Sequence, residues 1–444
     1  MLRRARVYCD PHLMVTGLAA TEETTPLDEI RIAIVGLGSR GLAWLRRLQE
    51  MRGYRVVAVC DRIDGLRERA EATLQRPGDV TNHRSYEDVL ADQRVDAVAL
   101  TVRCREQGAL AAQALEAGKH VSAEVPAAHS IEDCWRIVLA AERSGCTYFL
   151  AEQTRYWGFI DAWRTMVAEG RLGHITLCEG QYFHYYVEKQ YQDPVSGAFF
   201  QPREGAAHPE AQPTWLQEMP PIHYLPHELS PMLKVLDDRV VEVVGMSTAA
   251  HSRAHPELAQ PDMQVALMKT EKGAILRMAV SFAQPHPQQN THWYQVVGTQ
   301  GRVEWRRSAR ELPKLWLADS GMHDLADVDW RRERQDAPPE ARGSGHGDAD
   351  YYIHAAFRAA LLEGRPPEFD VYRAMDTAAP AILAAESMAR DSALIPVPDF
   401  RPGANRRAGE HESSSEAPHA RQDLHSIRTA STSPASQALQ EAQP

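Results

Sequence analysis

Hydrophobic and polar residues alternate along the first third of the chain in the rhythm of strands and helices. Short apolar runs at 31–35 and 55–59 predict two buried strands, and spaced apolar residues after Gly41 predict a helix between them. Later segments continue this rhythm: strands are expected at 95–101, 120–125 and 147–152, and helices at 64–75, 107–117 and 131–143. Such alternation predicts a parallel, doubly wound α/β sheet, because each crossover must return over one face of the sheet.

The pattern changes after Arg155, where strand-like alternation becomes dominant. A helix is expected at 159–169, and the strands that follow are expected at 175–186, 240–247, 263–270, 274–282, 294–298 and 302–305. These elements predict an α+β domain with an open, largely antiparallel sheet. The stretch 192–221 is rich in Pro, Gly and Gln and predicts a long loop at the edge of that sheet. Helices at 348–363 and 371–390 complete the fold.

Three glycines follow the first strand, in the order Gly36-Leu-Gly38-Ser-Arg-Gly41. In a strand–turn–helix unit the first glycine permits the tight turn, the second lets the backbone approach a pyrophosphate, and the third allows close packing of helix and strand. Asp61 ends the second strand, where an acid binds the adenosine ribose of a dinucleotide. The alternative interpretation is a tight turn in an unrelated α/β protein.

Asp61 favours NAD as the cofactor, because its carboxylate accepts from a ribose 2′-hydroxyl and repels a 2′-phosphate. NADP stays possible, since the guanidinium of Arg62 could pair with that phosphate. Ligands of such sheets gather at the carboxyl ends of the strands. The residues predicted to bind the cofactor are Gly36, Gly38, Ser39, Arg40, Gly41, Asp61, Arg62, Thr101 and Glu124.

We expect four segments: an N-terminal extension without order (1–29), a Rossmann NAD-binding domain (30–152), an α+β domain for substrate binding and oligomerisation (153–402), and a disordered tail (403–444). The tail consists largely of Ser, Ala, Arg, Glu, Gln and Pro, which bury too little apolar surface to order it.

Composition narrows the classes of partner. The 444 residues carry a formal charge of −11 without a basic stripe, which argues against nucleic acid and membrane partners. The six cysteines form no Cys-x-x-Cys pair, as expected for reduced thiols in a cytoplasmic protein. No metal-ligand spacing is present among the 19 histidines, so no catalytic metal is expected.

The run from Leu115 to Pro126, LEAGKHVSAEVP, resembles the signature of the Gfo/Idh/MocA oxidoreductases. Two further segments resemble this family, EGRLGHI at 169–175 and VVGTQGRV at 296–303, and the resemblance covers roughly 30–400. It implies a nicotinamide cofactor, a carbohydrate or polyol substrate, and a homodimer or homotetramer joined through the open sheet.

Departures from the family pattern are equally informative. Val125 stands where the family's dehydrogenases carry a catalytic Lys, and His223 and Ser230 replace two acids around the catalytic His227. Three features resemble the NAD-dependent glycoside hydrolase branch of the family: the sequence Glu-Val-Pro, a Tyr three residues before the His, and a Gly-His-Gly segment. Here the last two features are Tyr224 and His346.

His227 is the first candidate for proton transfer, because a neutral imidazole can accept an alcohol proton as hydride leaves the same carbon. Tyr224 and His223 are further catalytic candidates. The residues predicted to bind substrate are Glu152, Arg155, Tyr156 and His346. The structural alternatives are a core histidine for His227, a packed aromatic for Tyr224, a surface cluster at 152–156, and a turn with an incidental histidine at His346.

We therefore expect an NAD(P)-dependent oxidoreductase that acts on a sugar, polyol or sugar derivative by hydride transfer. The first alternative is a redox-neutral, NAD-dependent glycoside hydrolase, in which oxidation of a ring hydroxyl permits elimination of the aglycone. The second alternative is a non-catalytic NAD-binding sensor or assembly subunit.

Overall fold

The computed structural model describes residues 28–193, 197–249, 251–287 and 290–403. Cys9 and almost all of the two predicted terminal segments lie outside these residues. Within the described residues, no helix is long and apolar enough to cross a membrane.

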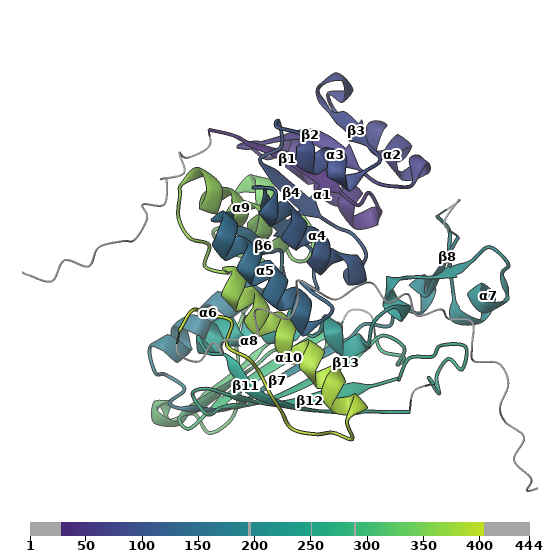
Figure 1. Ribbon diagram of the computed structural model, residues 1–444. Helices are drawn as coiled ribbons and strands as arrows, with labels where there is room; N and C mark the ends of the chain where they lie inside the picture. Colours follow the sequence, from purple (N-terminus) through teal and green to yellow (C-terminus); the bar gives the residue numbers. More distant parts are fainter. Residues whose placement is uncertain (1–27, 194–196, 250, 288–289, 404–444) are drawn as a thin grey trace, which may run out of the picture. The chain divides into compact units, whose positions relative to one another are not determined.

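A six-stranded parallel sheet forms from the first part of the chain (Figure 1). Its strand order is β3-β2-β1-β4-β5-β6, and every pairing is parallel. The strands are β1 (Ile30–Val35), β2 (Tyr54–Cys60), β3 (Thr81–His83), β4 (Ala97–Leu100), β5 (His120–Ala123) and β6 (Tyr148–Leu150). The predicted Rossmann-type sheet is confirmed, and the sequence pattern missed only its short edge strand β3.

Helices connect these strands as parallel crossovers require. They are α1 (Ser39–Glu50), α2 (Asp64–Glu71), α3 (Tyr86–Ala91), α4 (Cys104–Glu116) and α5 (Ile131–Ser144). The last of them shows how local sequence sets its bounds. The side chain of Ser130 accepts a hydrogen bond from the backbone of Asp133 at its start, and Gly145 adopts a left-handed conformation with φ of 68° at its end.

A nine-stranded sheet contains most of the remaining strands, in the order β17-β16-β15-β14-β7-β13-β12-β11-β18. The members are β7 (Ile175–Phe183), β11 (Val240–Ser247), β12 (Gln264–Thr270), β13 (Ile275–Ser281), β14 (His292–Gly298), β15 (Gly301–Glu304), β16 (Lys314–Leu317), β17 (Ala326–Asp327) and β18 (Ile395–Pro396). All pairings are antiparallel except that of β7 with β13. This mixed, largely antiparallel sheet confirms the predicted fold class.

Three longer helices accompany this sheet: α6 (Gly158–Ala168), α8 (Pro226–Leu236) and α10 (Val371–Ala389). A fourth, α9 (Ala349–Leu362), packs against β1 of the parallel sheet. Figure 1 shows α10 crossing the sheet, and it packs against both β11 and α5. Every residue of α8 is buried, although the helix carries His227, Glu228, Ser230 and Lys234. Buried polar groups are costly unless they are paired, so this helix requires partners for each of them.

The stretch 192–221, expected to be one long loop, contains regular structure. It contributes to a three-stranded sheet of order β10-β8-β9, with β8 (Tyr191–Gln192), β9 (Phe199–Phe200) and β10 (Gln212–Pro213), and it contains α7 (Pro202–Ala207). The strands have two residues each, too few for a hydrophobic alternation to reveal them.

Candidate active site

The glycine turn between β1 and α1 has little room for side chains. Gly36 has φ of +88°, and a Cβ on Gly41 would lie 1.9 Å from the carbonyl oxygen of Gly36. Thr101, at the end of β4, donates a hydrogen bond from Oγ1 to that same oxygen at 2.6 Å. By contrast, a Cβ on Gly38 would meet nothing within 4 Å. The turn therefore packs closely against α1 and the end of β4. Open space remains beside the N-terminus of α1, where an anion binds favourably.

Asp61 lies beside this turn and accepts two backbone hydrogen bonds. Its Oδ2 accepts from Leu37 N at 2.8 Å, and its Oδ1 accepts from Ile63 N at 2.9 Å. Each carboxylate oxygen retains a further acceptor position for a ribose hydroxyl. Arg62 forms an ion pair with Glu106 at 3.0 Å on the surface. Glu106 already pairs with the guanidinium of Arg62, and its own negative charge would repel a 2′-phosphate. Both effects favour NAD over NADP.

A charged network connects the start of α1 to the Gly-His-Gly loop. Arg40 lies 3.0 Å from Glu124 and donates two hydrogen bonds of 3.0 Å to Asp350, which also lies 3.0 Å from His346 Nδ1. Burial would lower the pKa of Arg40, but the two carboxylates raise it above its ordinary value. Burial would raise the pKa of Asp350, but His346 and Arg40 hold it below its ordinary value. The network fixes Arg40 as a cation beside the glycine turn.

Glu124 has one oxygen in this network and one without a partner. Its Oε1 receives Arg40 and, at 3.3 Å, the amide of Gln153, whereas its Oε2 is buried without a hydrogen-bond partner. Burial raises the pKa of Glu124 despite the opposing effect of Arg40. An orphaned buried oxygen at the carboxyl end of β5 is where a hydroxyl or amide of a ligand would be accepted.

His227 is oriented by Glu152, which follows β6. Its Nδ1 lies 2.9 Å from Glu152 Oε2 and 3.0 Å from Oε1, and the carboxylate is fully buried. Thr154 donates to the same carboxylate through its backbone N–H at 2.9 Å and its hydroxyl at 2.8 Å. Burial would raise the pKa of Glu152, but His227 and Thr154 hold it below its ordinary value. The ionised carboxylate accepts from Nδ1–H, which leaves Nε2 as the ring nitrogen that can contact a ligand.

Aromatic and imidazole rings surround His227. The ring of Tyr224 lies edge-on to it at 4.6 Å between centroids, and Tyr182 lies at 5.3 Å. Along β7 and beyond, His184 stacks on Tyr186 at 3.5 Å, and the hydroxyl groups of Tyr182 and Tyr186 lie 3.1 Å apart. Burial lowers the pKa of His184 to about 4, so its ring is neutral at pH 7.

These rings and the charged network belong to one region. Glu124 and Arg40 both act on the pKa values of Tyr186 and Tyr224, which burial raises above the ordinary value. The structure therefore brings together the glycine turn, Glu124, the network at His346, and the group around His227.

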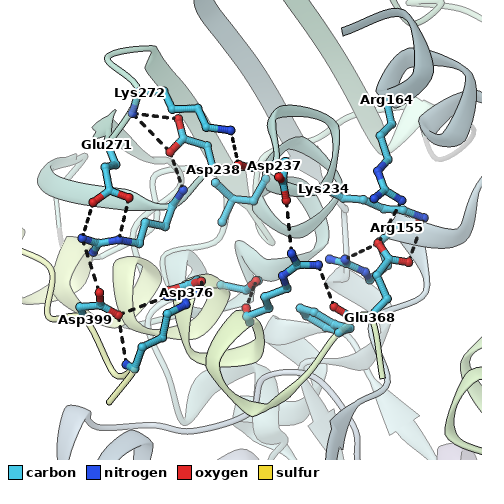
Figure 2. A pocket seen from close by; sticks show the side chains of 16 residues that line it. Arg155, Arg164, Lys234, Asp237, Asp238, Glu271, Lys272, Glu368, Asp376 and Asp399 are labelled. Carbon is cyan, nitrogen blue, oxygen red and sulfur yellow. Dashed lines mark hydrogen bonds and ion pairs between the residues drawn. The ribbon is translucent and has the colours of Figure 1, made fainter. Parts of the chain in front are cut away.

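Three predicted site residues lie elsewhere or make other contacts. His223 is buried edge-on against His129 at 4.9 Å, and burial lowers its pKa to about 3. Arg155 donates to Ser230 Oγ at 2.8 Å and lines a separate charged pocket of about 250 Å³ (Figure 2). Tyr156 is buried with its ring 5.4 Å from the ammonium of Lys234. The substrate role predicted for Arg155 and Tyr156 gains no geometric support from these contacts.

Several residues of the region were not predicted as site residues. Tyr182, His184 and Tyr186 occupy alternate positions of one aromatic run, a spacing that is equally typical of side chains packed on a sheet. Asp350 stands four residues after His346, a helical spacing that could have revealed the pair. His292 and Glu228 had no distinguishing local pattern. Within the described residues, no group of three or more His, Cys, Asp or Glu side chains is arranged to hold a metal ion.

The residues at the strand ends fit an NAD molecule in three respects. The open backbone at Gly38 begins a helix whose first turn contains no acid, as a pyrophosphate requires. Asp61 offers acceptors at the position of a ribose, and Glu124 offers an orphaned oxygen farther along the sheet edge. The fold and these residues define an NAD-binding protein of the Rossmann type.

Comparison with known proteins gives the family. Residues 30–152 match the oxidoreductase family with the NAD-binding Rossmann fold, and residues 164–397 match the C-terminal alpha/beta domain of the same family. The chain belongs to the Gfo/Idh/MocA oxidoreductase family, and its cofactor is NAD.

Relatives in this family include glycosidases. A glycosyl hydrolase family 109 protein of Phocaeicola vulgatus is 26% identical over 84% of this chain and 95% of its own length. An α-N-acetylgalactosaminidase of Bacteroides fragilis is 26% identical over 85% of this chain and 93% of its own length. The predicted similarity to the NAD-dependent glycoside hydrolase branch is confirmed.

Solved structures with the same fold include sugar dehydrogenases. The WlbA dehydrogenase of Bordetella pertussis, in complex with NADH and UDP-GlcNAcA, has a TM-score of 0.62 at 20% identity and covers 84% of this chain and 99% of its own. A levoglucosan dehydrogenase with NADH and levoglucosan has a TM-score of 0.66 at 15% identity over 83% of this chain and 100% of its own. These likenesses show the fold.

The environment of Asp61 generates a prediction about cofactor choice. We expect NAD to bind more tightly than NADP, and Asp61→Asn to reduce the preference by roughly 10- to 100-fold, because the amide removes the charge that repels a 2′-phosphate. Glu106→Gln, which releases Arg62, should improve NADP binding. Fluorescence titration with both cofactors measures this, with the exposed Asp88→Asn as control. Equal affinity of the unchanged protein for both cofactors would contradict the preference.

The network at Arg40 generates a prediction about stability. Asp350→Ala should lower the free energy of unfolding at pH 7 by roughly 1–3 kcal/mol, because a largely buried guanidinium loses one of its two carboxylates. Asp350 has a lowered pKa in the folded state, so its stabilisation is present above its unfolded pKa of about 3.9 and is lost as the pH falls through the lower folded value. Urea unfolding between pH 7 and pH 3 tests both statements. Asp329→Ala, which removes the exposed partner of Arg331, should change little.

Proposed function

We propose that the protein is an NAD-dependent oxidoreductase that removes hydride from a carbinol carbon of a sugar, polyol or sugar derivative. The observation that carries this proposal is the pair of His227 and Glu152, joined at 2.9 Å between Nδ1 and a fully buried carboxylate at the edge where the parallel strands end. Bound NAD supplies the hydride acceptor. The relatives and structural neighbours that act on sugars support the substrate class.

His227 acts as the general base in this proposal. The ionised Glu152 fixes the proton on Nδ1, so Nε2 takes the hydroxyl proton as the carbon loses hydride. Tyr294 donates a hydrogen bond to the carbonyl oxygen of His227 at 2.9 Å, and the hydroxyl of Thr154, whose one proton is shared with Glu152, lies 2.7 Å from the same oxygen. These contacts hold the backbone at the start of α8. The base is thus positioned through both its ring and its main chain.

The remaining proposed roles follow from the geometry. Tyr224 lies close enough to the ring of His227 to share in proton transfer, and Glu124 would receive a hydroxyl or amide at its orphaned oxygen. His346 keeps about half of its side chain exposed while Asp350 holds Nδ1. It would contact the sugar from the Gly-His-Gly loop.

A redox-neutral glycosidase is the second candidate function, and one observation favours it. A net oxidation needs one proton acceptor, whereas glycoside cleavage by oxidation, elimination, addition of water and reduction needs several groups that carry protons. The rings of Tyr182, His184, Tyr186 and Tyr224 surround His227 and could supply them. The family 109 relatives and Val125, which cannot donate a proton, support the same reaction.

Removal of the proposed base tests the first step. We expect His227→Ala to lower kcat by roughly 100- to 10,000-fold, the range for general acid–base groups, while the affinity for NAD stays nearly constant. His255→Ala, which alters a histidine bonded to Tyr185, provides a matched control. Full turnover by His227→Ala would remove this residue from the mechanism.

The fate of the cofactor separates the two candidate functions. We expect a free sugar or polyol to change the absorbance of the reduced nicotinamide in proportion to product, because each turnover of a dehydrogenase leaves one cofactor reduced. Aryl glycosides are assayed beside the free sugars with the same enzyme. Sustained release of the aglycone without net cofactor reduction would replace the dehydrogenase by the glycosidase.

A further inference from the structure

A second pair of glutamate and histidine lies directly beside the first. Glu228 follows His227 on α8, and its Oε1 lies 2.7 Å from Nδ1 of His292, at the start of β14. Both Glu152 and Glu228 are fully buried, whereas the side chains of His227 and His292 remain 8% and 11% exposed. Each carboxyl group therefore holds an Nδ1 and leaves the Nε2 of its histidine for other contacts.

The surroundings of the two carboxyl groups are different. Glu152 accepts from His227 and twice from Thr154, as an ionised carboxylate requires. Oε2 is buried without a hydrogen-bond partner in both carboxyl groups, so the difference lies at Oε1. Oε1 of Glu228 lies 2.7 Å from Nδ1 of His292 and otherwise receives only a long bond of 3.4 Å from the hydroxyl of Tyr294. Its stem packs tightly against β7, where a Cβ on Gly180 would lie 2.9 Å from that of Glu228. A buried carboxylate with so few donors is costly, and a neutral carboxylic acid is much less so.

The charges around this second pair favour the neutral forms of both Glu228 and His292. Burial and the nearby negative charge of Glu152 raise the pKa of Glu228 well above its ordinary value, against the opposing effects of Tyr294 and Arg332. Burial lowers the pKa of His292 well below its ordinary value, and the neighbouring Arg332 acts in the same direction. A positive charge on His184, His227 or His346 would lower the pKa of His292 in the same direction.

These states determine where the ring proton of His292 lies. A neutral Glu228 donates its hydroxyl proton to Nδ1, so the single ring proton of His292 is on Nε2. Within the part of the chain that the structure describes, we find no hydrogen-bond partner for that Nε2. His227 has the opposite arrangement, with its proton on Nδ1 and an acceptor at Nε2.

We propose that His292 presents Nε2–H as a fixed hydrogen-bond donor to the reacting oxygen of the sugar, while Nε2 of His227 accepts the proton from that oxygen. The rings lie 6.2 Å apart between centroids, a separation that lets one substrate oxygen lie between them. Glu228 is a positioning residue that fixes the tautomer. Because Val125 cannot polarise the hydroxyl, this donor would stabilise the negative charge that develops as hydride leaves. The proposal rests on the proposed hydride transfer.

A direct test reads the tautomers without any substrate. In the NAD-bound, full-length protein labelled with ¹⁵N-histidine, each ring nitrogen reports whether it carries a proton. We expect His292 to be protonated on Nε2 alone and His227 on Nδ1 alone, with signals assigned by loss in His292→Gln and His227→Gln. A proton on Nδ1 of His292, or on both of its nitrogens, would overturn the proposal whatever the enzyme's substrate is.

A kinetic test separates the donor from a packing role. His292→Leu should lower kcat by roughly 100- to 1,000-fold with little change in KM, the effect of losing one donor to a developing oxyanion. His292→Gln, whose amide can donate from nearly the same position, should recover most of that loss. Glu228→Gln, which keeps a donor to Nδ1, should stay within about tenfold of the unchanged enzyme, whereas Glu228→Leu should resemble His292→Leu.

Two kinds of control separate a loss of catalysis from a loss of folding in these variants. Thermal unfolding and NAD titration show whether each variant folds, and His255→Leu alters a histidine outside the cluster. Equal loss in His292→Gln and His292→Leu, with both folded, would contradict the donor role. Unchanged kcat in His292→Leu would overturn it while leaving the proposed function intact. If no sugar is turned over at all, the proposed function fails, and the tautomer measurement alone decides the state of His292.

Discussion

The hydrogen-bonded pair of Glu152 and His227 connects the parallel sheet to the helix that packs on the nine-stranded sheet. Glu152 follows the last strand of the parallel sheet, and His227 begins the buried helix α8 beside the nine-stranded sheet. Thr154 binds both partners, through the carboxylate of Glu152 and the carbonyl oxygen of His227. If this contact were lost, a buried carboxylate would have no counterpart, and the proposed base would lose the group that sets its tautomer.

The burial of α8 makes such pairing obligatory along the whole helix. Ser230 accepts from Arg155, and Lys234 donates to Asp161 at 2.7 Å and to the carbonyl oxygen of Arg155 at 2.9 Å. Arg155 and Tyr156, expected to bind substrate, both contact this helix: Arg155 donates to Ser230, and the ring of Tyr156 lies beside Lys234. Figure 2 shows Arg155 and Lys234 together around Glu368. The same requirement for partners therefore applies to His227 and to the charged residues near it.

Some of the site could be predicted because its signals are local in the sequence. The glycines at 36, 38 and 41 have fixed spacing, since a Cβ would not fit at Gly36 or Gly41 and the backbone at Gly38 lies open, and Asp61 follows its strand directly. His292 could not be predicted in this way. It lies 64 positions from Glu228 along the chain, and its meaning depends on that buried carboxyl group. The same holds for Arg40, whose partner Asp350 is 310 positions away.

By itself, the sequence determined the class of fold, the cofactor and the position of the proposed base, because hydrophobic periodicity, glycine turns and motif spacing act over short stretches of chain. Only the tertiary structure decided which polar residues share a site. It placed Glu152 beside His227, Arg155 beside Ser230, His223 against His129, and His292 beside Glu228. Protonation states are also decided only by the tertiary structure, because a pKa depends on burial and on charges that distant segments bring together.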